Sequence, residues 1–343
     1  MRELWGSPSE GKHVGKRILM AGGAGFLGSH LVDRLLRRNE LELLVVVDDF
    51  WTGTRENLKH IDDRRMHVVD CSVQEFATHE TFDEIIHFAS PASPPWYMSD
   101  PARTIKANVG GALNLINLIR KGGRISFAST SEVYGDPMIT PQPESYRGVV
   151  DCTGPRSSYD ESKRCTESLL FEMRRTRDLD VRIVRLFNVY GPRTRIDDGR
   201  AVSNFIGQAL SDGILTVYGD GRQTRSWGYV DDIIDALERY FWLDETSYCG
   251  PLNIGNDREI AVIDVAHFIA SLVPGSQIKF LPPVPQDPTN RRPDLTLARQ
   301  VLPGWAAKVE YEEGVRRTFD WFKSKMTLME RIPEPPPPLL LQE

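Results

Sequence analysis

A glycine-rich loop between an expected strand and an expected helix constrains this chain more than any other stretch. Residues 16–21 form a short apolar run, residues 22–28 read Gly-Gly-Ala-Gly-Phe-Leu-Gly, and residues 29–38 have helical apolar spacing. Glycines at such spacing permit a tight turn, a close approach to a pyrophosphate and close packing of helix on strand. The helix N-terminus adds amides and a positive dipole end. The stretch predicts a dinucleotide-binding βαβ unit, with contacts from Gly22, Gly25, Phe26, Leu27 and Gly28.

The second expected strand, residues 43–47, indicates which dinucleotide is bound, because Asp48 and Asp49 follow it. Asp48 lies about 20 residues beyond the last glycine, where a carboxylate binds the adenosine ribose hydroxyls. A carboxylate at this place repels a 2′-phosphate, so the sequence favours NAD over NADP. Asp49 is a second cofactor candidate, and a solvated loop acid is the alternative.

The third and fourth expected strands, residues 66–70 and 84–89, end at the same sheet edge. Asp70 fits two roles equally, accepting from the adenine amine or capping the next helix. Ala89 begins the exit of the fourth strand, where open parallel sheets bind ligands. His87 lies inside that strand and is interpreted as a core histidine.

A long helix is expected over residues 101–120, and it contains the polar residues Lys106, Asn108 and Asn114. Asparagine in a helix interior is mildly unfavourable, which makes a buried polar role plausible. For Asn108 we favour a solvated side chain instead.

Tyr159 and Lys163 are four residues apart and therefore share one face of a helix. A phenol has a reference pKa of about 10 and is a poor base at neutral pH. An ammonium one turn away favours the phenolate and is expected to lower that pKa. The pair can then take a proton from an alcohol while a neighbouring cofactor takes a hydride.

The fifth expected strand, residues 124–129, leads into Thr130, Ser131 and Glu132. A hydroxyl and a carboxylate are thus expected at the sheet edge, next in sequence to the helix of the Tyr-Lys pair. Capping of the following turn is the alternative role for Thr130 and Ser131.

Composition excludes several classes of protein. The net charge of −6 argues against a nucleic-acid binder, which needs a basic face. The four cysteines lack paired short spacing, so they predict no zinc site and no disulfide framework, and they fit a reduced, cytoplasmic protein. No apolar run approaches the roughly 20 residues of a membrane span. We expect no metal, nucleic-acid or membrane partner.

These motifs together resemble the extended short-chain dehydrogenase/reductase family. Within it, four segments are similar to UDP-glucuronate decarboxylases (UDP-xylose synthases), and the similarity runs from about residue 17 to residue 322; the segments are residues 89–95, 129–137, 154–156 and 198–205. The resemblance implies an α/β fold: a Rossmann-type doubly wound parallel sheet with a smaller α/β substrate lobe. It also implies tightly held NAD and a homodimer.

The expected domain boundaries follow from that resemblance. Residues 15–187 with 226–258 would form the NAD-binding domain, and residues 188–225 with 259–328 the nucleotide-sugar domain. Residues 1–14 and 329–343 are expected to be flexible ends.

The resemblance further implies a reaction on UDP-glucuronic acid. Tyr159 would remove the proton of the sugar 4-hydroxyl as hydride passes to NAD, and the resulting 4-ketone would let the carboxylate leave as carbon dioxide. Thr130 and Tyr159 would then stabilise the oxyanion. Carbon 5 is reprotonated and NADH reduces the ketone. Glu132 either orients a proton-donating water or destabilises the carboxylate by repulsion.

Three further positions bear on the substrate. Ser131 stands where 4,6-dehydratases of the family carry an aspartate, which favours an acid substrate. By its place in the pattern, Arg291 would reach the reacting sugar, while Arg292 would face the diphosphate or a structural partner. Arg225 suits a diphosphate, because a guanidinium binds it in a bidentate way. The other expected substrate contacts are Lys106, Asn114, Asn188, Arg200, Asn204 and Tyr218.

Two alternatives stay open at this point. A 4-epimerase or 4,6-dehydratase of a nucleotide sugar would use the same frame. A non-catalytic dinucleotide-sensing protein would keep the fold and typically lose Tyr159 or Lys163, and this chain has both.

Overall fold

The computed structural model describes residues 15–177, 179–243, 248–283 and 291–326. The expected flexible ends, residues 1–14 and 329–343, lie outside these ranges.

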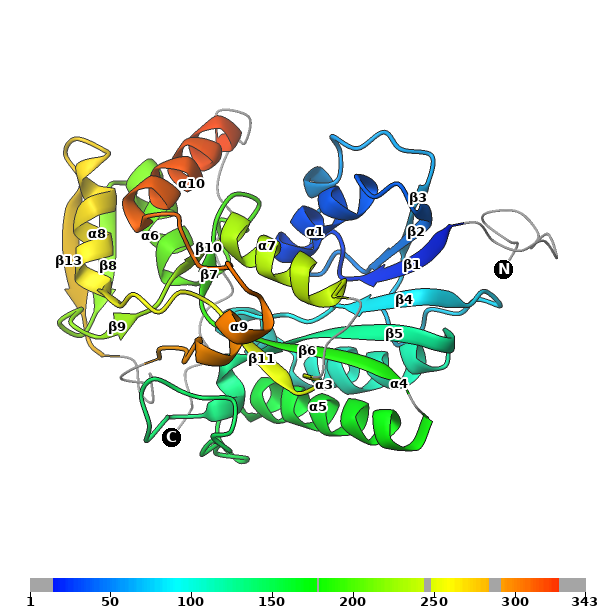
Figure 1. Cartoon of the computed structure of the whole chain (residues 1–343). Coiled ribbons are helices and arrows are strands. Elements are labelled where there is room, and N and C mark those ends of the chain that lie inside the picture. The colour runs from blue at the N-terminus through cyan, green and yellow to red at the C-terminus, as the bar shows by residue number, and fades with distance from the viewer. Residues whose placement is uncertain (1–14, 178, 244–247, 284–290, 327–343) are drawn as a thin grey trace.

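Seven parallel strands form the central sheet, in the order β11-β6-β5-β4-β1-β2-β3 (Figure 1). The chain winds outward from β1 through β2 to β3, and outward in the other direction from β4 through β5 to β6. This confirms the expected doubly wound sheet, and it puts the reversal of strand order between β1 and β4, where such sheets bind ligands. The strands are β1 (Lys16–Ala21), β2 (Leu41–Asp48), β3 (Met66–Asp70), β4 (Phe82–His87), β5 (Ile119–Thr130), β6 (Asp180–Leu186) and β11 (Pro251–Ile254).

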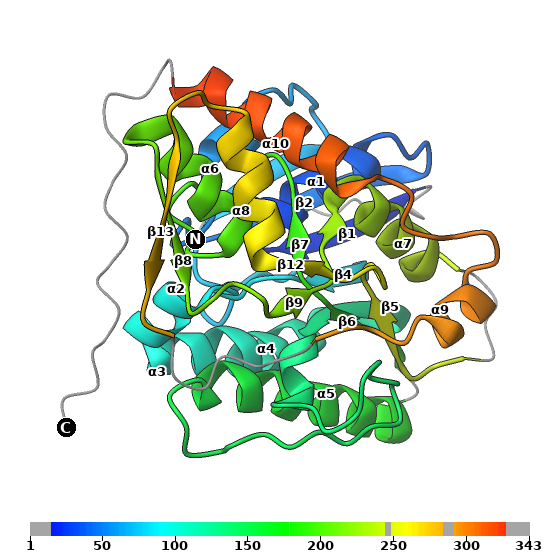
Figure 2. The same ribbon diagram turned by 90° about the vertical axis from the view of Figure 1, so that its left-hand side faces the viewer.

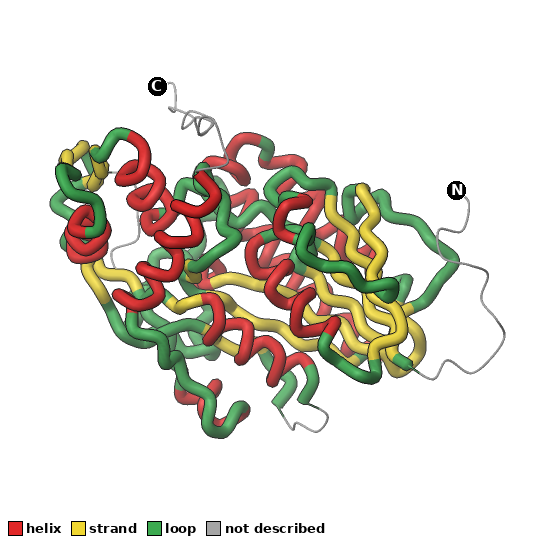
Figure 3. Tube along the Cα trace, turned by 90° about the horizontal axis from the view of Figure 1, so that it is seen from above, coloured by secondary structure: helices red, strands yellow, loops and turns green. Residues whose placement is uncertain are grey.

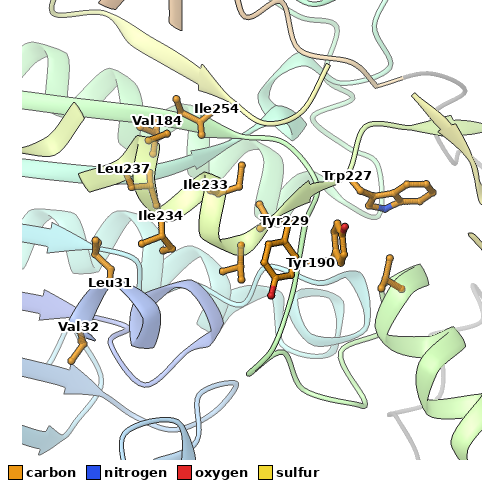
Figure 4. Close-up of a cluster of buried hydrophobic side chains, with 14 of the residues drawn as sticks. Leu31, Val32, Val184, Tyr190, Trp227, Tyr229, Ile233, Ile234, Leu237 and Ile254 are labelled. Carbon is orange, nitrogen blue, oxygen red and sulfur yellow. The ribbon is translucent and has the colours of Figure 1, made fainter. Parts of the chain in front are cut away.

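Helices cover both faces of this sheet (Figure 1). On one face lie α1 (Phe26–Leu36) and α7 (Val230–Phe241), and on the other α3 (Pro101–Ile105), α4 (Gly111–Ile116) and α5 (Ser157–Arg177). Alternate residues of each strand point to opposite faces, so both faces of the sheet carry apolar side chains. Figure 4 shows the core on the α1 and α7 side, where Ile233 and Leu237 lie close to Val184 and Ile254 of the sheet.

The expected helix over residues 101–120 is interrupted and shorter. A π-helical turn, Lys106–Gly110, separates α3 from α4, α4 ends at Ile116, and β5 already begins at Ile119. Within the π-helical turn the expectation of a solvated Asn108 is wrong. Its side chain is fully buried and donates to Ser162 Oγ at 2.9 Å, because the widened turn faces α5.

His87 is a core residue, as expected. It is fully buried on β4, and its Nε2 lies 3.1 Å from the carbonyl oxygen of Asn108. Burial lowers the pKa of His87 to about 3, so the ring is neutral and serves packing rather than proton transfer.

A smaller layered unit lies beside the carboxyl ends of the strands, which the arrowheads of Figure 1 mark, and Figures 2 and 3 show it from two further sides. In it, β8 (Ile214–Tyr218) pairs in parallel with β13 (Gln277–Leu281), and α6 (Ala201–Ser211) and α8 (Val262–Ser271) pack on that pair. The predicted domain boundaries themselves stay a prediction. The other elements are α2 (Pro94–Ser99), α9 (Thr296–Val301), α10 (Tyr311–Met326), and the paired short strands β7 (Val189–Tyr190) with β10 (Gly228–Tyr229) and β9 (Thr224–Arg225) with β12 (Ile260–Ala261).

Candidate active site

The glycine loop after β1 has the shape of a phosphate cradle. Gly22 has φ +81°, and a Cβ added there would collide with the backbone of Ala89, the residue expected at the β4 exit. A Cβ on Gly28 would collide with Gly22 O, so the helix packs directly on the loop. A Cβ on Gly25 would meet only Gly22 O, at 3.3 Å, so space is open beside the N-terminus of α1. The loop therefore fits a pyrophosphate held by backbone amides.

Asp48 ends β2 and is fixed by the backbone on both sides. Its Oδ2 accepts from the Ala24 amide and its Oδ1 from the Phe50 amide, each at 2.9 Å. Each carboxylate oxygen keeps further acceptor capacity, which fits the two hydroxyls of a ribose. Burial raises the pKa of Asp48 to about 6.

The raised pKa of Asp48 gives a pH-dependent prediction. Below about pH 6 the carboxylate becomes protonated, and one oxygen changes from acceptor to donor, so it no longer accepts from both ribose hydroxyls. We expect the affinity for NAD to fall as the pH drops through about 6 and to be flat above it. Titration of NAD into apo protein on both sides of that pH measures this. The Asp48→Asn variant should bind NAD weakly, with an affinity that does not depend on pH. The Asp48→Ala variant should bind NAD and NADP with more similar affinities. If Asp48→Ala kept the preference for NAD, the assignment of Asp48 to the ribose would be wrong.

The two other acids at this edge form ion pairs. Asp49 accepts from Arg103 Nη2 at 2.9 Å, and Asp70 from Arg55 Nη2 at 2.6 Å. Asp70 is exposed and pairs with this arginine instead of capping a helix, so the capping alternative is wrong. Its contact with an adenine stays a prediction, as does the contact of Asp49 with the cofactor.

Tyr159 and Lys163 both lie on the buried face of α5. The Lys163 Nζ donates to the Ala128 carbonyl at 2.7 Å and lies 5.7 Å from the ring centroid of Tyr159. Tyr159 is only 5% exposed and stacks on Tyr97 of α2, with ring centroids 4.8 Å apart and planes 7° from parallel. The sequence did not single out Tyr97, although it lies just beyond the Pro94-Pro95 segment that the family resemblance used.

One expectation about this pair is wrong. Lys163 was expected to lower the pKa of Tyr159, yet burial raises the pKa of Tyr159 to about 12 and lowers the pKa of Lys163 to about 7. The physical reason is that both groups lose water, which penalises the charged form of each. A hydrogen bond between Thr130 and Tyr159 and the charge of Arg200 act in the opposite direction on the phenol.

Thr130 ends β5, and Ser131 and Glu132 follow it at the predicted edge. Ser131 and Glu132 open a 3-10 turn, Ser131–Tyr134, and Thr130 Oγ1 caps it by accepting from the Glu132 amide at 3.2 Å. Thr130 thus combines its capping role with its contact to Tyr159. Ser131 is 2% exposed.

Glu132 lies between two arginines. Its Oε2 accepts from Arg156, and its Oε1 forms an ion pair with Arg291. Arg291 is 4% exposed and also donates to Gly135 O at 3.0 Å. Burial lowers the pKa of Arg291 to about 10, which leaves it charged at neutral pH. Sequence reasoning gave Arg156 no role, although it ends the quoted Gly-Pro-Arg segment.

Arg291 and Arg292 point to different partners, as expected for neighbours in an extended segment. Arg292 Nη1 donates to Glu259 Oε2 at 3.0 Å, which gives it a structural partner. Arg225 lies on β9, where its Nη1 donates to Thr224 O at 2.9 Å.

The other predicted substrate residues divide into two groups. Arg200 forms an ion pair with Asp198 and lies 6.0 Å above the ring of Phe26, at the start of α1. In contrast, Asn114 uses its amide to donate to the carbonyls of Val73 and Phe76, at 2.9 and 2.8 Å. The structure therefore gives Asn114 the role of holding α4 to the chain after β3, in place of the predicted substrate contact.

The substrate contacts of the four remaining candidates stay predictions, and the structure gives only their places in the fold. Asn188 precedes β7, and its carbonyl accepts from the Gly228 amide, while Asn204 lies one turn into α6. Tyr218 ends β8 and is 45% exposed, and Lys106 is exposed in the π-helical turn.

In the described ranges, no group of three or more His, Cys, Asp and Glu side chains is arranged to hold a metal ion. No helix among the described residues combines the length and apolar character that crossing a bilayer requires.

Residues 18–255 match the model of the NAD dependent epimerase/dehydratase family. The chain belongs to this family. A UDP-glucuronic acid decarboxylase of Arabidopsis thaliana is 49% identical over 302 residues, which are 87% of each chain. Among solved structures, the UDP-glucose 4-epimerase of Thermotoga maritima with UDP-glucose is 29% identical, with a TM-score of 0.78 over 90% of this chain and 99% of that one. A dTDP-glucose 4,6-dehydratase of Streptomyces venezuelae with NAD bound is 26% identical, with a TM-score of 0.81 over 92% and 99%.

Membership of the NAD dependent epimerase/dehydratase family agrees with the geometry around the glycine loop. The protein uses NAD, and the open backbone at Gly25 and the fixed carboxylate of Asp48 fit its pyrophosphate and ribose. When bound, NAD supplies the acceptor for a hydride and later its donor.

Proposed function

We propose that this protein converts UDP-glucuronic acid to UDP-xylose by decarboxylation through a 4-keto intermediate, with NAD regenerated in the site. The observation that carries the proposal is Glu132 held between Arg156 and Arg291, in the segment that carries Thr130. Asp160 is a second acid near Arg156, but burial raises the pKa of its carboxyl to about 7, so the two guanidinium groups around Glu132 keep a surplus of positive charge in a largely buried place. A substrate carboxylate beside the reacting carbon complements that charge. The Arabidopsis thaliana relative at 49% identity is named a UDP-glucuronic acid decarboxylase, which supports the proposal.

Tyr159 is the base in this scheme. Its phenolate takes the proton of the sugar 4-hydroxyl and becomes the phenol, and the hydrogen bond with Thr130 favours the phenolate before that transfer. After carbon dioxide leaves, Thr130 and Tyr159 hold the developing oxyanion at the former carbonyl oxygen. Ser131 is small and uncharged, so it does not repel the substrate carboxylate.

The ion pairs of Glu132 favour one of its two roles. Arg156 and Arg291 offset the carboxylate charge, which weakens any repulsion that would drive decarboxylation. We therefore assign Glu132 the orientation of a proton-donating water at carbon 5, with Arg291 next to the reacting carboxylate.

The nucleotide would be held on the other side of the sugar. We propose that residues 188–225 with 259–328 bind the nucleotide sugar and that residues 15–187 with 226–258 bind NAD. In this arrangement the Arg225 guanidinium binds the diphosphate of the nucleotide. Arg200 lies 6.0 Å from the ring of Phe26, and its charge acts to lower the pKa of Tyr159, which suits a contact with the substrate near the reacting carbon. The further proposed contacts are Lys106, Asn188, Asn204 and Tyr218, while Arg292 takes the structural alternative through Glu259.

The experiment that tests the reaction is incubation of the protein with UDP-glucuronate and NAD, with carbon dioxide measured and the sugar product followed by NMR. We expect carbon dioxide and UDP-xylose in equal amounts. A 4-epimerised acid without carbon dioxide would instead assign the protein to the chemistry named for the Thermotoga maritima neighbour. Release of the 4-keto pentose would show that reduction does not follow in the same site.

We also propose a homodimer located in the cytoplasm. The side chains of Ile105 on α3 and Leu113 on α4 are 45% and 51% exposed, although both are apolar. A second copy packed on α3 and α4 would bury them, as apolar interface cores do. Light scattering of the protein and of Leu113→Glu tests this: a dimeric mass for the first and a monomeric mass for the second are expected, and equal masses would contradict it.

A further inference from the structure

Gln142 lies in the connection between the 3-10 turn and α5, outside the site described above, and its side chain is fully buried. Its Nε2 donates to the Ile139 carbonyl at 2.6 Å and to Thr140 Oγ1 at 3.1 Å. Its Oε1 accepts from the Arg292 amide at 3.0 Å. Both ends of the side-chain amide are therefore engaged, as a buried polar group requires.

The backbone of Gln142 holds the same segment. Its amide donates to Arg292 O at 2.9 Å, and its carbonyl accepts from the Asp294 amide at 3.0 Å, so Gln142 and Pro293 form a β-bridge. Gln142 thus makes three hydrogen bonds to the residues that directly follow Arg291. Because the bonds come from both backbone and side chain, they fix the position and the rotation of that segment.

A line of buried polar contacts joins Gln142 to the helix that carries Tyr159 and Lys163. Asn253 Nδ2 donates to Gln142 O at 2.9 Å, and Tyr134 OH donates to Asn253 Oδ1 at 2.7 Å. Arg185 donates to Tyr134 OH at 3.1 Å and to Glu167 Oε2 at 2.7 Å. Glu167 lies one turn beyond Lys163 on α5, so the contacts link the Arg291 segment to the catalytic helix.

We infer that Gln142 is a positioning residue that sets the Arg291 guanidinium against Glu132. This inference rests on the proposed function, since it assumes that Arg291 acts at the reacting sugar. The physical reason is the sensitivity of catalysis to placement: a shift of about 1 Å in a positioned group can cost about 10²-fold in rate. Gln142 acts through Arg291 and does not itself touch the substrate.

The test is a double-mutant cycle of Gln142→Met with Arg291→Ala. Methionine fills a similar volume and removes the side-chain hydrogen bonds. We expect Gln142→Met to lower kcat about 10- to 100-fold with UDP affinity unchanged, and to lower kcat no further in the Arg291→Ala background. Gln208→Met is the matched control, because Gln208 makes the same kind of paired contact with Thr216, at 2.8 and 2.9 Å, on the β8 side. Its effect should be small and the same in both backgrounds.

A second readout needs no turnover. Arg291 is buried, so it should resist an arginine-specific reagent such as phenylglyoxal, and peptide mass spectrometry should show several-fold faster modification in Gln142→Met but not in Gln208→Met. Equal protection of Arg291 in all variants, or equal kcat losses in both backgrounds, would overturn the inference. Absence of carbon dioxide release by the unmodified protein would instead refute the proposed function, and the modification rates would then decide the role of Gln142. If Gln142→Met does not fold, Gln142→Asn retains the amide donor and acceptor on a shorter side chain and should show a smaller loss of kcat.

Discussion

Replacing Tyr159 by phenylalanine is expected to lower turnover by roughly 10²–10⁴, the usual size of a general acid–base contribution. Phenylalanine keeps the ring that stacks on Tyr97, so the buried packing of α5 on α2 should survive. What is lost is the phenolic oxygen that bonds to Thr130 and, as the phenolate, takes the substrate proton.

Carbon dioxide release, thermal unfolding and bound NAD should be measured on the same preparation. Tyr240→Phe is a matched control. Tyr240 lies on α7 and is also fully buried, and its hydroxyl donates to the carbonyl oxygen of Gly250 at 3.0 Å. That variant should lose about 1 kcal/mol of unfolding free energy and keep its turnover. Near-native carbon dioxide release by Tyr159→Phe would show that another group is the base.

Replacing Arg291 by alanine should lower kcat by about 10²–10³, similar to the loss of one donor from an oxyanion site. Because Arg291 is buried against Glu132, its loss leaves that carboxylate with Arg156 alone and removes the positive charge facing the sugar. UDP affinity should change little, since the guanidinium acts away from the nucleotide. Arg225→Ala is expected to show the reverse, a raised KM with kcat nearly intact.

Steady-state kinetics of both variants, with UDP binding measured by calorimetry, separates these effects. Removing one partner of a buried ion pair can also cost about 3–5 kcal/mol of stability, so unfolding must be followed to confirm that the assayed protein is folded. If Arg291→Ala changed only UDP affinity, Arg291 would be a nucleotide clamp, and the placement of the chemistry at its side would be wrong.

Features set by neighbouring residues could be predicted from the sequence. The expected strand 16–21 is β1 to the residue, and the glycine loop has the conformation that its spacing indicates. Tyr159 and Lys163 share the buried face of one helix because their spacing fixes it. Thr130 lies at the end of β5, because the apolar run that predicts this strand ends just before it.

Features set by tertiary packing could not be predicted. Arg156 and Arg291 reach Glu132 from distant parts of the chain, and no local pattern pairs them. The pKa of Tyr159 rises because of burial, which helical spacing does not reveal. The same holds for Asn108, whose burial follows from a π-helical turn packed on α5.

The last strand of the sheet sets a limit on how this protein could be divided or recombined. β11 pairs with β6, from Ile183 with Pro251 to Leu186 with Ile254, yet residues 187–250 lie between the two strands in the chain. A gene fragment that stops before residue 251 would leave the backbone of β6 unpaired along an apolar edge, which invites aggregation. A chimaera that exchanges residues 187–250 must therefore bring the chain back so that β11 pairs with β6 in the same register. This segment is an insertion between two paired strands and cannot be treated as an independent unit.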